Sequence, residues 1–251
     1  MRKPLFAANW KMNKTVSESV LLAKALKNEF LGLTNREVVL CPPFTSLSAV
    51  AAEIRIAPIA LGAQNMHYEK EGAFTGEISP FMLQELGVKY VIVGHSERRQ
   101  HFNEGNELIN KKIKSAAAFG LHPIFCVGET EEERKKKKTK AIIGKQVKEG
   151  LKGVSEFEMR KVNIAYEPVW AIGTGKNATP EQAEEVHEFI RNLVKRSYND
   201  EIADNLRILY GGSVNPENVE GFMIKSAVDG VLVGGASLDP KKFVKIVKYD
   251  Y

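Results

Sequence analysis

The sequence has little cysteine and no long apolar run. Only Cys41 and Cys126 occur in 251 residues, and both lie in short apolar stretches. Two cysteines cannot form the disulfide framework of a small secreted domain, so we expect two buried thiols and a cytoplasmic protein. No stretch approaches the roughly 20 apolar residues of a membrane-spanning helix, and the first ten residues lack a signal-peptide core. We therefore expect no membrane association.

Positive charge is in modest excess, but no nucleic-acid-binding motif accompanies it. The net charge is +5, and the densest basic run is Arg134 to Lys138. Glu131, Glu132 and Glu133 precede that run, and such alternating blocks usually form a solvated helix face. We therefore expect no nucleic-acid partner. A positive potential that attracts a small anion is the alternative use of the charge.

Flexible linkers and composition breaks are also absent, while short apolar segments recur along the whole chain. The segments are Leu5–Trp10, Glu37–Cys41, Ile59–Ala63, Tyr90–Gly94, Pro123–Val127, Val162–Tyr166, Arg207–Gly211 and Gly230–Gly234. Several are continuously apolar, which is typical of parallel strands buried on both faces.

Helical patterns separate these strands. They cover Ser17–Phe30, Asn106–Phe119, Glu131–Gly150, Pro180–Tyr198 and Pro240–Val247. Thr179 and Pro180 have the residue types of a helix start, Asn215 and Pro216 repeat that signal, and Gly120 and Gly150 are placed to end helices.

Eight alternations of strand and helix predict one α/β domain over residues 1–251, a closed (β/α)8 barrel. A doubly wound sheet is the alternative. It would place a glycine-rich fingerprint in the first turn after a strand, and residues 9–13 contain no glycine. Catalytic groups of a barrel lie at the carboxyl ends of its strands, so polar residues that interrupt an apolar strand there become candidates.

Five strand ends carry such residues. They provide Asn9 and Lys11, the segment 94–99 with His95 and Glu97, Glu167, the segment 211–213 with Ser213, and Gly234 with Gly235. A base, an imidazole, a cation and a glycine-lined anion site would thus share one rim.

Seven segments in this order resemble the signatures of the triosephosphate isomerase family. They are residues 8–12, 61–65, 72–77, 93–99, 165–175, 210–214 and 232–238, and together they span almost the whole chain. The resemblance implies the interconversion of dihydroxyacetone phosphate and D-glyceraldehyde 3-phosphate through an enediolate, a step of glycolysis and gluconeogenesis.

The family resemblance also assigns roles at the strand ends. Glu167 would be the general base, although a strand-end glutamate in a salt bridge is the plainer interpretation. His95 would be a neutral imidazole whose pKa is held down by a helix N-terminus. The other four histidines match no catalytic position, so we expect surface or packing roles for His67, His101, His122 and His187.

Cationic and anion-binding groups complete the implied site. Lys11 would stabilise negative charge, although a Schiff-base lysine of an aldolase-type barrel is the alternative. Asn9 would donate to the substrate, and Glu97 would lie near Lys11, with a proton shuttle as a further possible role. The substrate phosphate would bind at Gly173, Ser213, Gly234 and Gly235, and 168–178 would form a closing lid.

The segment Met66–Glu77 is long for a loop between a strand and a helix. In the family it inserts into a neighbouring subunit, and its exposed Phe74 favours a partner, so we expect a homodimer held around Thr75, with a tetramer as the alternative. One departure from the family pattern is Lys137, where a glycine is usual. No metal-ligand spacing and no nucleotide-binding loop occurs, so we expect no cofactor and no metal. A barrel that binds phosphorylated ligands without turnover is a further alternative.

Overall fold

Eight parallel strands close into a barrel in the computed structural model, which describes residues 2–171 and 177–250. Each strand pairs with its neighbours in chain order, and β8 pairs with β1 to complete the ring. The strands are β1 (Leu5–Asn9), β2 (Glu37–Cys41), β3 (Ile59–Ala63), β4 (Val88–Val93), β5 (His122–Val127), β6 (Asn163–Tyr166), β7 (Ile208–Tyr210) and β8 (Gly230–Val233). The predicted (β/α)8 barrel is confirmed.

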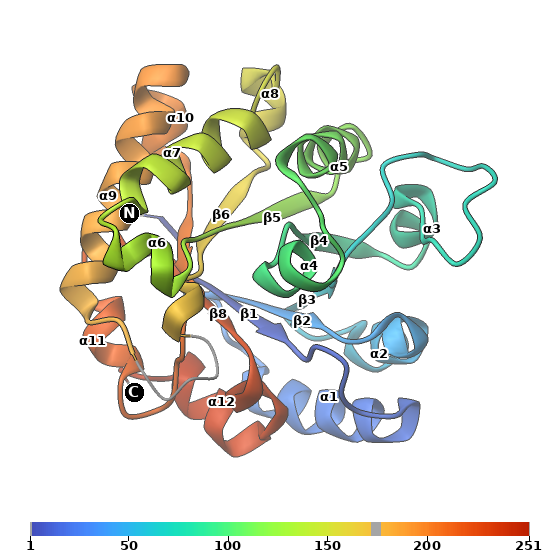
Figure 1. The fold of residues 1–251 in the computed structure, drawn as a ribbon. Coiled ribbons are helices and arrows are strands. Elements are labelled where there is room, and N and C mark those ends of the chain that lie inside the picture. Colours follow the sequence, from blue (N-terminus) through green and yellow to red (C-terminus); the bar gives the residue numbers. More distant parts are fainter. Residues whose placement is uncertain (1, 172–176, 251) are drawn as a thin grey trace.

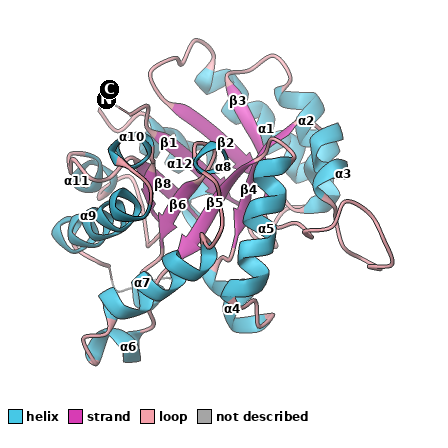
Figure 2. Cartoon of the chain, turned by 90° about the horizontal axis from the view of Figure 1, so that it is seen from above, coloured by secondary structure: helices cyan, strands magenta, loops and turns pink. Residues whose placement is uncertain are grey.

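Helices surround the strands (Figures 1 and 2). They are α1 (Val16–Phe30), α2 (Leu47–Ile54), α3 (Pro80–Glu85), α4 (Ser96–His101), α5 (Asn106–Ala118), α6 (Glu131–Lys135), α7 (Thr139–Gly150), α8 (Glu156–Met159), α9 (Pro180–Ser197), α10 (Asp200–Asn205), α11 (Val219–Met223) and α12 (Pro240–Val247). Short 3-10 turns lie at Phe44–Ser46, Val169–Ala171 and Gly235–Leu238. Among the described residues, no helix has the length and apolar character to cross a membrane.

The predicted helix Glu131–Gly150 is wrong as a single element. It is divided into α6 and α7 by a turn at 136–138, where Lys137 has a φ of 54°. That conformation favours glycine, so the lysine occupies a strained backbone position at the place where the family pattern has a glycine. The predicted helix start at Asn215 holds in part. Its side chain accepts hydrogen bonds from the backbone N–H groups of Glu217 and Asn218, but α11 begins only at Val219.

Two apolar layers form the core. One fills the barrel interior and includes both cysteines. The larger one lies between the strands and the helices. Both thiols are free and buried, as predicted, and burial raises the pKa of Cys41 and Cys126. Alternating residues of each strand therefore enter different layers, which explains why the strands are apolar on both faces.

A polar cluster closes the amino-terminal end of the barrel, opposite the strand ends that carry the candidate site. The Arg207 guanidinium donates to Glu37 Oε2 at 2.8 Å, to the Tyr90 hydroxyl at 2.9 Å and to Asn163 Oδ1 at 2.9 Å. Lys89 Nζ donates to the other Glu37 oxygen at 2.6 Å. Burial raises the pKa of Glu37, but the hydrogen bonds from Lys89 and Arg207 outweigh burial and lower that pKa to about 2.

We predict that Glu37→Gln lowers the free energy of unfolding by about 2 to 3 kcal/mol at neutral pH, since it leaves Arg207 partly unpaired. Glu37 has a lowered native pKa, so its charge stabilises the protein above its unfolded pKa. That contribution falls as the pH drops from 4.5 toward about 2. The difference between variant and wild type should shrink over this range in urea unfolding.

The matched control is Glu132→Gln, which removes an exposed ion pair with Lys136. Such a pair contributes little, so this change should cost under about 0.5 kcal/mol at every pH. An equal loss in both variants would contradict a special role for the polar cluster around Arg207.

Candidate active site

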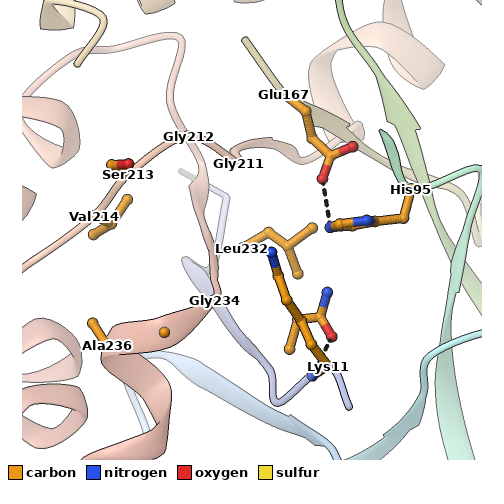
Figure 3. Close-up of a pocket in the computed structure, with 12 residues that line it drawn as sticks. Lys11, His95, Glu167, Gly211, Gly212, Ser213, Val214, Leu232, Gly234 and Ala236 are labelled. Atoms are coloured by element: carbon orange, nitrogen blue, oxygen red, sulfur yellow. Dashed lines mark hydrogen bonds and ion pairs between the residues drawn. The ribbon is translucent and has the colours of Figure 1, made fainter. Parts of the chain in front are cut away.

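A cavity of about 310 Å³ opens at the carboxyl ends of the strands. Figure 3 shows the side chains that converge on it from several strand ends. The lining residues are Asn9, Lys11, His95, Glu167, Gly211, Gly212, Ser213, Val214, Leu232, Gly234, Gly235 and Ala236. Seven of the nine predicted site residues therefore lie around one space.

The two remaining predicted residues differ in outcome. Glu97 lies beside the cavity and contacts both Lys11 and His95. Gly173 lies outside the described residues, as does most of the tip of the predicted lid. Sequence reasoning missed the contribution of Leu232 and Ala236, because an apolar strand residue and a small loop residue carry no chemical signal of their own.

His95 is fixed at the amino-terminal end of α4, the helix predicted to start there. Its Nδ1 accepts a hydrogen bond from the backbone N–H of Glu97 at 3.3 Å. An imidazole nitrogen that accepts a hydrogen bond carries no proton, so the proton lies on Nε2. Nε2 is 2.9 Å from Glu167 Oε1. The helix start therefore selects the tautomer that aims a donor toward the carboxylate and the cavity.

Glu167 follows β6 and is only 2% exposed. Its Oε2 accepts a hydrogen bond from the backbone N–H of Ser96 at 2.8 Å, and its Oε1 faces His95. Burial raises the pKa of Glu167, but His95, the Ser96 N–H and Lys11 outweigh burial and lower it. In this arrangement the carboxylate is held at the wall of the cavity in its charged form.

The pKa of His95 differs from the sequence-based expectation. Burial lowers this pKa, but the carboxylates of Glu167 and Glu97 outweigh burial and raise it above its ordinary value. The expected lowering by a helix N-terminus is thus wrong for this arrangement, because a buried carboxylate contacts the ring directly. Moving Glu167 away from His95 would remove the largest influence that raises the pKa.

Lys11 reaches the cavity from a strained backbone position. Its φ is 53°, and its backbone N–H donates to Asn9 Oδ1 at 3.1 Å. Gln64 Nε2 donates to the Lys11 carbonyl at 2.9 Å. Lys11 Nζ forms an ion pair with Glu97 Oε1 at 2.5 Å. Backbone strain of this kind needs support from its surroundings, and these contacts supply it and direct the ammonium to the cavity.

Glycine backbone forms the side of the cavity beyond Lys11. A Cβ on Gly234 would lie 3.3 Å from Lys11 Cε, and a Cβ on Gly211 would lie 2.9 Å from Glu167 Cγ. These glycines let the backbone approach both charged side chains closely. Ser213 Oγ donates to the carbonyl of Ala171, which ties the strand end of β7 to the segment after Glu167. Exposed backbone N–H groups at such a place suit an anion.

No group of three metal-ligating side chains gathers in residues 2–171 or 177–250. The absence of a cofactor and of a metal stays a prediction. What the arrangement offers on its own is a carboxylate, an imidazole N–H donor and an ammonium around one anion-binding space.

Comparisons with known proteins agree with this chemistry. The sequence model described as triosephosphate isomerase matches residues 4–250. A triosephosphate isomerase of Carboxydothermus hydrogenoformans is 56% identical over 248 residues, which cover 99% of each chain. That of Dictyoglomus turgidum is 54% identical over 248 residues, 99% of this chain and 100% of its own. That of Endomicrobium trichonymphae is 57% identical over 249 residues, again 99% of each.

We predict that Glu167→Gln lowers the pKa of His95, because it removes the charge that opposes the effect of burial. Nitrogen NMR of a labelled imidazole, assigned with a His95→Asn variant, measures the change. Glu97→Gln serves as the graded control: Glu97 is more exposed and lies 3.5 Å from Nδ1, so its removal should lower the pKa less. A His95 pKa unchanged by Glu167→Gln would show that the contact does not control this titration.

Proposed function

The chain belongs to the triosephosphate isomerase family and interconverts dihydroxyacetone phosphate and D-glyceraldehyde 3-phosphate; we propose that Glu167, His95 and Lys11 carry out this reaction. The observation that supports these roles is the convergence of the three side chains on one cavity with a glycine-lined side. Moving a carbonyl between adjacent carbons requires a proton to leave one carbon and another to reach the next. One base that faces both carbons can do both.

Glu167 is the proposed base. Its carboxylate takes a proton from the carbon next to the carbonyl and returns it to the neighbouring carbon after an enediolate has formed. In the structure both of its oxygens face Ser96 and His95, so it leaves these partners to reach the substrate. Outside these contacts burial is the main influence left on its pKa, and burial makes the carboxylate more basic.

His95 is the proposed hydrogen-bond donor to the substrate oxygens. The Glu97 N–H occupies Nδ1, so Nε2 presents a proton to the cavity. As a proton donor, a neutral imidazole is closer in acidity to an enediol than an imidazolium is, and it can pass a proton between the two oxygens. Once Glu167 has moved to the substrate, burial and Lys11 lower the pKa of His95 and favour this neutral form.

Lys11 and Asn9 are proposed to stabilise the charge that develops on the oxygens. The ion pair with Glu97 fixes the direction in which the Lys11 ammonium points. A Schiff-base lysine attacks a carbonyl carbon with its own nitrogen, and a Lys11 Nζ held by Glu97 is engaged elsewhere, which argues against the aldolase-type alternative. Glu97 touches both Lys11 and His95 and is placed to orient the two groups.

The phosphate of the substrate is proposed to bind the backbone N–H groups of Gly173, Ser213, Gly234 and Gly235. Ser213 and Gly234 line the cavity on the side away from His95 (Figure 3), Gly235 is also in the cavity lining, and Lys11 adds a nearby positive charge. Phosphate sites after the seventh and eighth strands recur among barrels. Binding the phosphate here would place the three-carbon portion between Lys11 and Glu167.

We also propose that residues 1–251 form one domain that acts as a cytoplasmic homodimer. The loop between β3 and α3 extends away from the barrel (Figure 1). Phe74 in this loop is 42% exposed and packs on His67 with ring centroids 4.2 Å apart. Met12, next to Lys11, is 96% exposed. A partner that covers these apolar groups would also restrict the strained backbone of Lys11.

We predict that Glu167→Asp lowers kcat by about 100-fold while KM changes by no more than a few fold. The shorter side chain withdraws the carboxylate by about 1 Å, and misplacement of this size costs on the order of 10²-fold. The proposed phosphate ligands are untouched, so the loss belongs to turnover and not to binding. A coupled assay with dihydroxyacetone phosphate, run beside thermal unfolding, measures both quantities.

The opposing result for Glu167→Asp is easily recognised. A purely structural ion pair would lower the melting temperature by the equivalent of a few kcal/mol and leave the folded fraction fully active. Wild-type kcat at a reduced melting temperature would therefore remove Glu167 from the proposed role.

We predict that light scattering finds a dimer at micromolar concentration and that Phe74→Asp shifts it toward monomer. A charge in a covered apolar contact is costly to bury. Phe157→Asp is the matched control, since Phe157 is 70% exposed and lies in α8, far along the chain from the loop. A fully active wild-type monomer would contradict the proposed assembly.

A further inference from the structure

The strand ends on either side of β5 are not equivalent. On one side the peptides after Val127 continue to pair with the segment after β6: Glu167 N–H donates to Val127 O at 2.8 Å, and Val169 N–H donates to Glu129 O at 3.1 Å. Peptides of a strand alternate in direction, so Cys126 and Gly128 face the other side. There β4 has ended at Val93, and none of the described strands pairs with them.

Side chains take the place of the missing strand. Gln146 of α7 forms two hydrogen bonds with a single residue: its Oε1 accepts from the Gly128 N–H at 2.8 Å, and its Nε2 donates to the Gly128 carbonyl at 3.0 Å. Arg99 donates to the Cys126 carbonyl at 3.1 Å. The primary amide of Gln146 thus reproduces the donor and the acceptor that a neighbouring strand would have provided.

The residue that Gln146 holds supports the backbone of the proposed base. A Cβ on Gly128 would lie 1.7 Å from the carbonyl oxygen of Glu167, so the two main chains are packed as closely as a glycine permits. The next residue, Glu129, accepts hydrogen bonds from Tyr166 and from Trp170, on either side of Glu167 in the chain. A displacement of Gly128 would therefore move the chain from which Glu167 projects.

We propose that Gln146 is a positioning residue for the isomerisation, which fixes Gly128 and through it the backbone of Glu167. It touches neither the proposed substrate space nor the reacting groups, because the cavity is lined by other residues. The inference depends on the proposed role of Glu167 as the base. Its consequence is that a helix outside the barrel controls how accurately the carboxylate meets the carbon.

Gln146→Met tests the role by removing both hydrogen bonds while keeping a similar side-chain volume. We expect kcat to fall about 10-fold, since small misplacements of a base are costly, and KM to stay within about two-fold. Lys145→Met is the control on the same helix, because its side chain is 68% exposed and pairs with Glu149 of that helix. The control should retain wild-type kcat and KM.

Gln146→Glu gives a signature that a loss of stability cannot produce. A protonated carboxyl can donate to the Gly128 carbonyl and accept from its N–H, whereas an ionised one can only accept and repels that carbonyl. As the carboxyl becomes protonated, the ratio of variant to wild-type kcat should therefore rise several-fold between about pH 8 and about pH 5.5. NMR of the labelled side chain follows its protonation over the same range. The same ratio for Gln146→Met should stay constant.

The outcomes separate this inference from the proposed role of Glu167. Wild-type kcat in Gln146→Met, or a flat ratio in Gln146→Glu as its carboxyl protonates, would overturn the positioning role even if the melting temperature fell. Those results would leave the loss of turnover in Glu167→Asp intact. If Glu167→Asp instead turns over normally, the base assignment fails, and the positioning role fails with it.

Discussion

The site depends first on the pairing of β8 with β1, which closes the barrel. At this seam Gly230 has a φ of 143°, and a Cβ there would lie 1.9 Å from the Leu5 carbonyl oxygen, so only glycine lets the strands approach. Closure brings the last strand end against the first. Gly234 then lies beside Lys11: a Cβ added to Gly234 would be only 3.3 Å from Lys11 Cε. An open sheet would leave the cation and the glycine backbone at opposite edges.

A closed ring of parallel strands creates a second requirement at the same rim. Strands of unequal length end at different heights, so some backbone N–H and C=O groups lose their neighbours beside the candidate site. Here Arg99 donates to the Cys126 carbonyl, Gln146 accepts from the Gly128 N–H, and Gln64 donates to the Lys11 carbonyl. The rigidity of the rim therefore comes from side chains outside the cavity. Buried backbone groups without these partners would be costly and mobile.

The sequence predicts the strands well because burial on both faces produces continuous apolar runs, and β2 and β3 have the expected bounds. Short helices such as Pro80–Glu85 were not predicted, since six residues show no helical period. Polar strand ends identified most of the site. The contacts of Gln146 and the raised pKa of His95 could not be predicted from the sequence, because they depend on distances between groups that are remote in sequence.

In the proposed mechanism, one movement that breaks the contact between His95 and Glu167 would prepare both groups. While they touch, each stabilises the charged form of the other: the pKa of Glu167 is lowered and that of His95 is raised. Separation removes both effects and leaves burial, which acts in opposite directions on an acid and on an imidazole. Breaking the contact therefore raises the pKa of Glu167 and lowers that of His95. Each unit of either change corresponds to about 1.4 kcal/mol of free energy. A phosphate bound beside Lys11 could supply that free energy by drawing the carboxylate to the substrate.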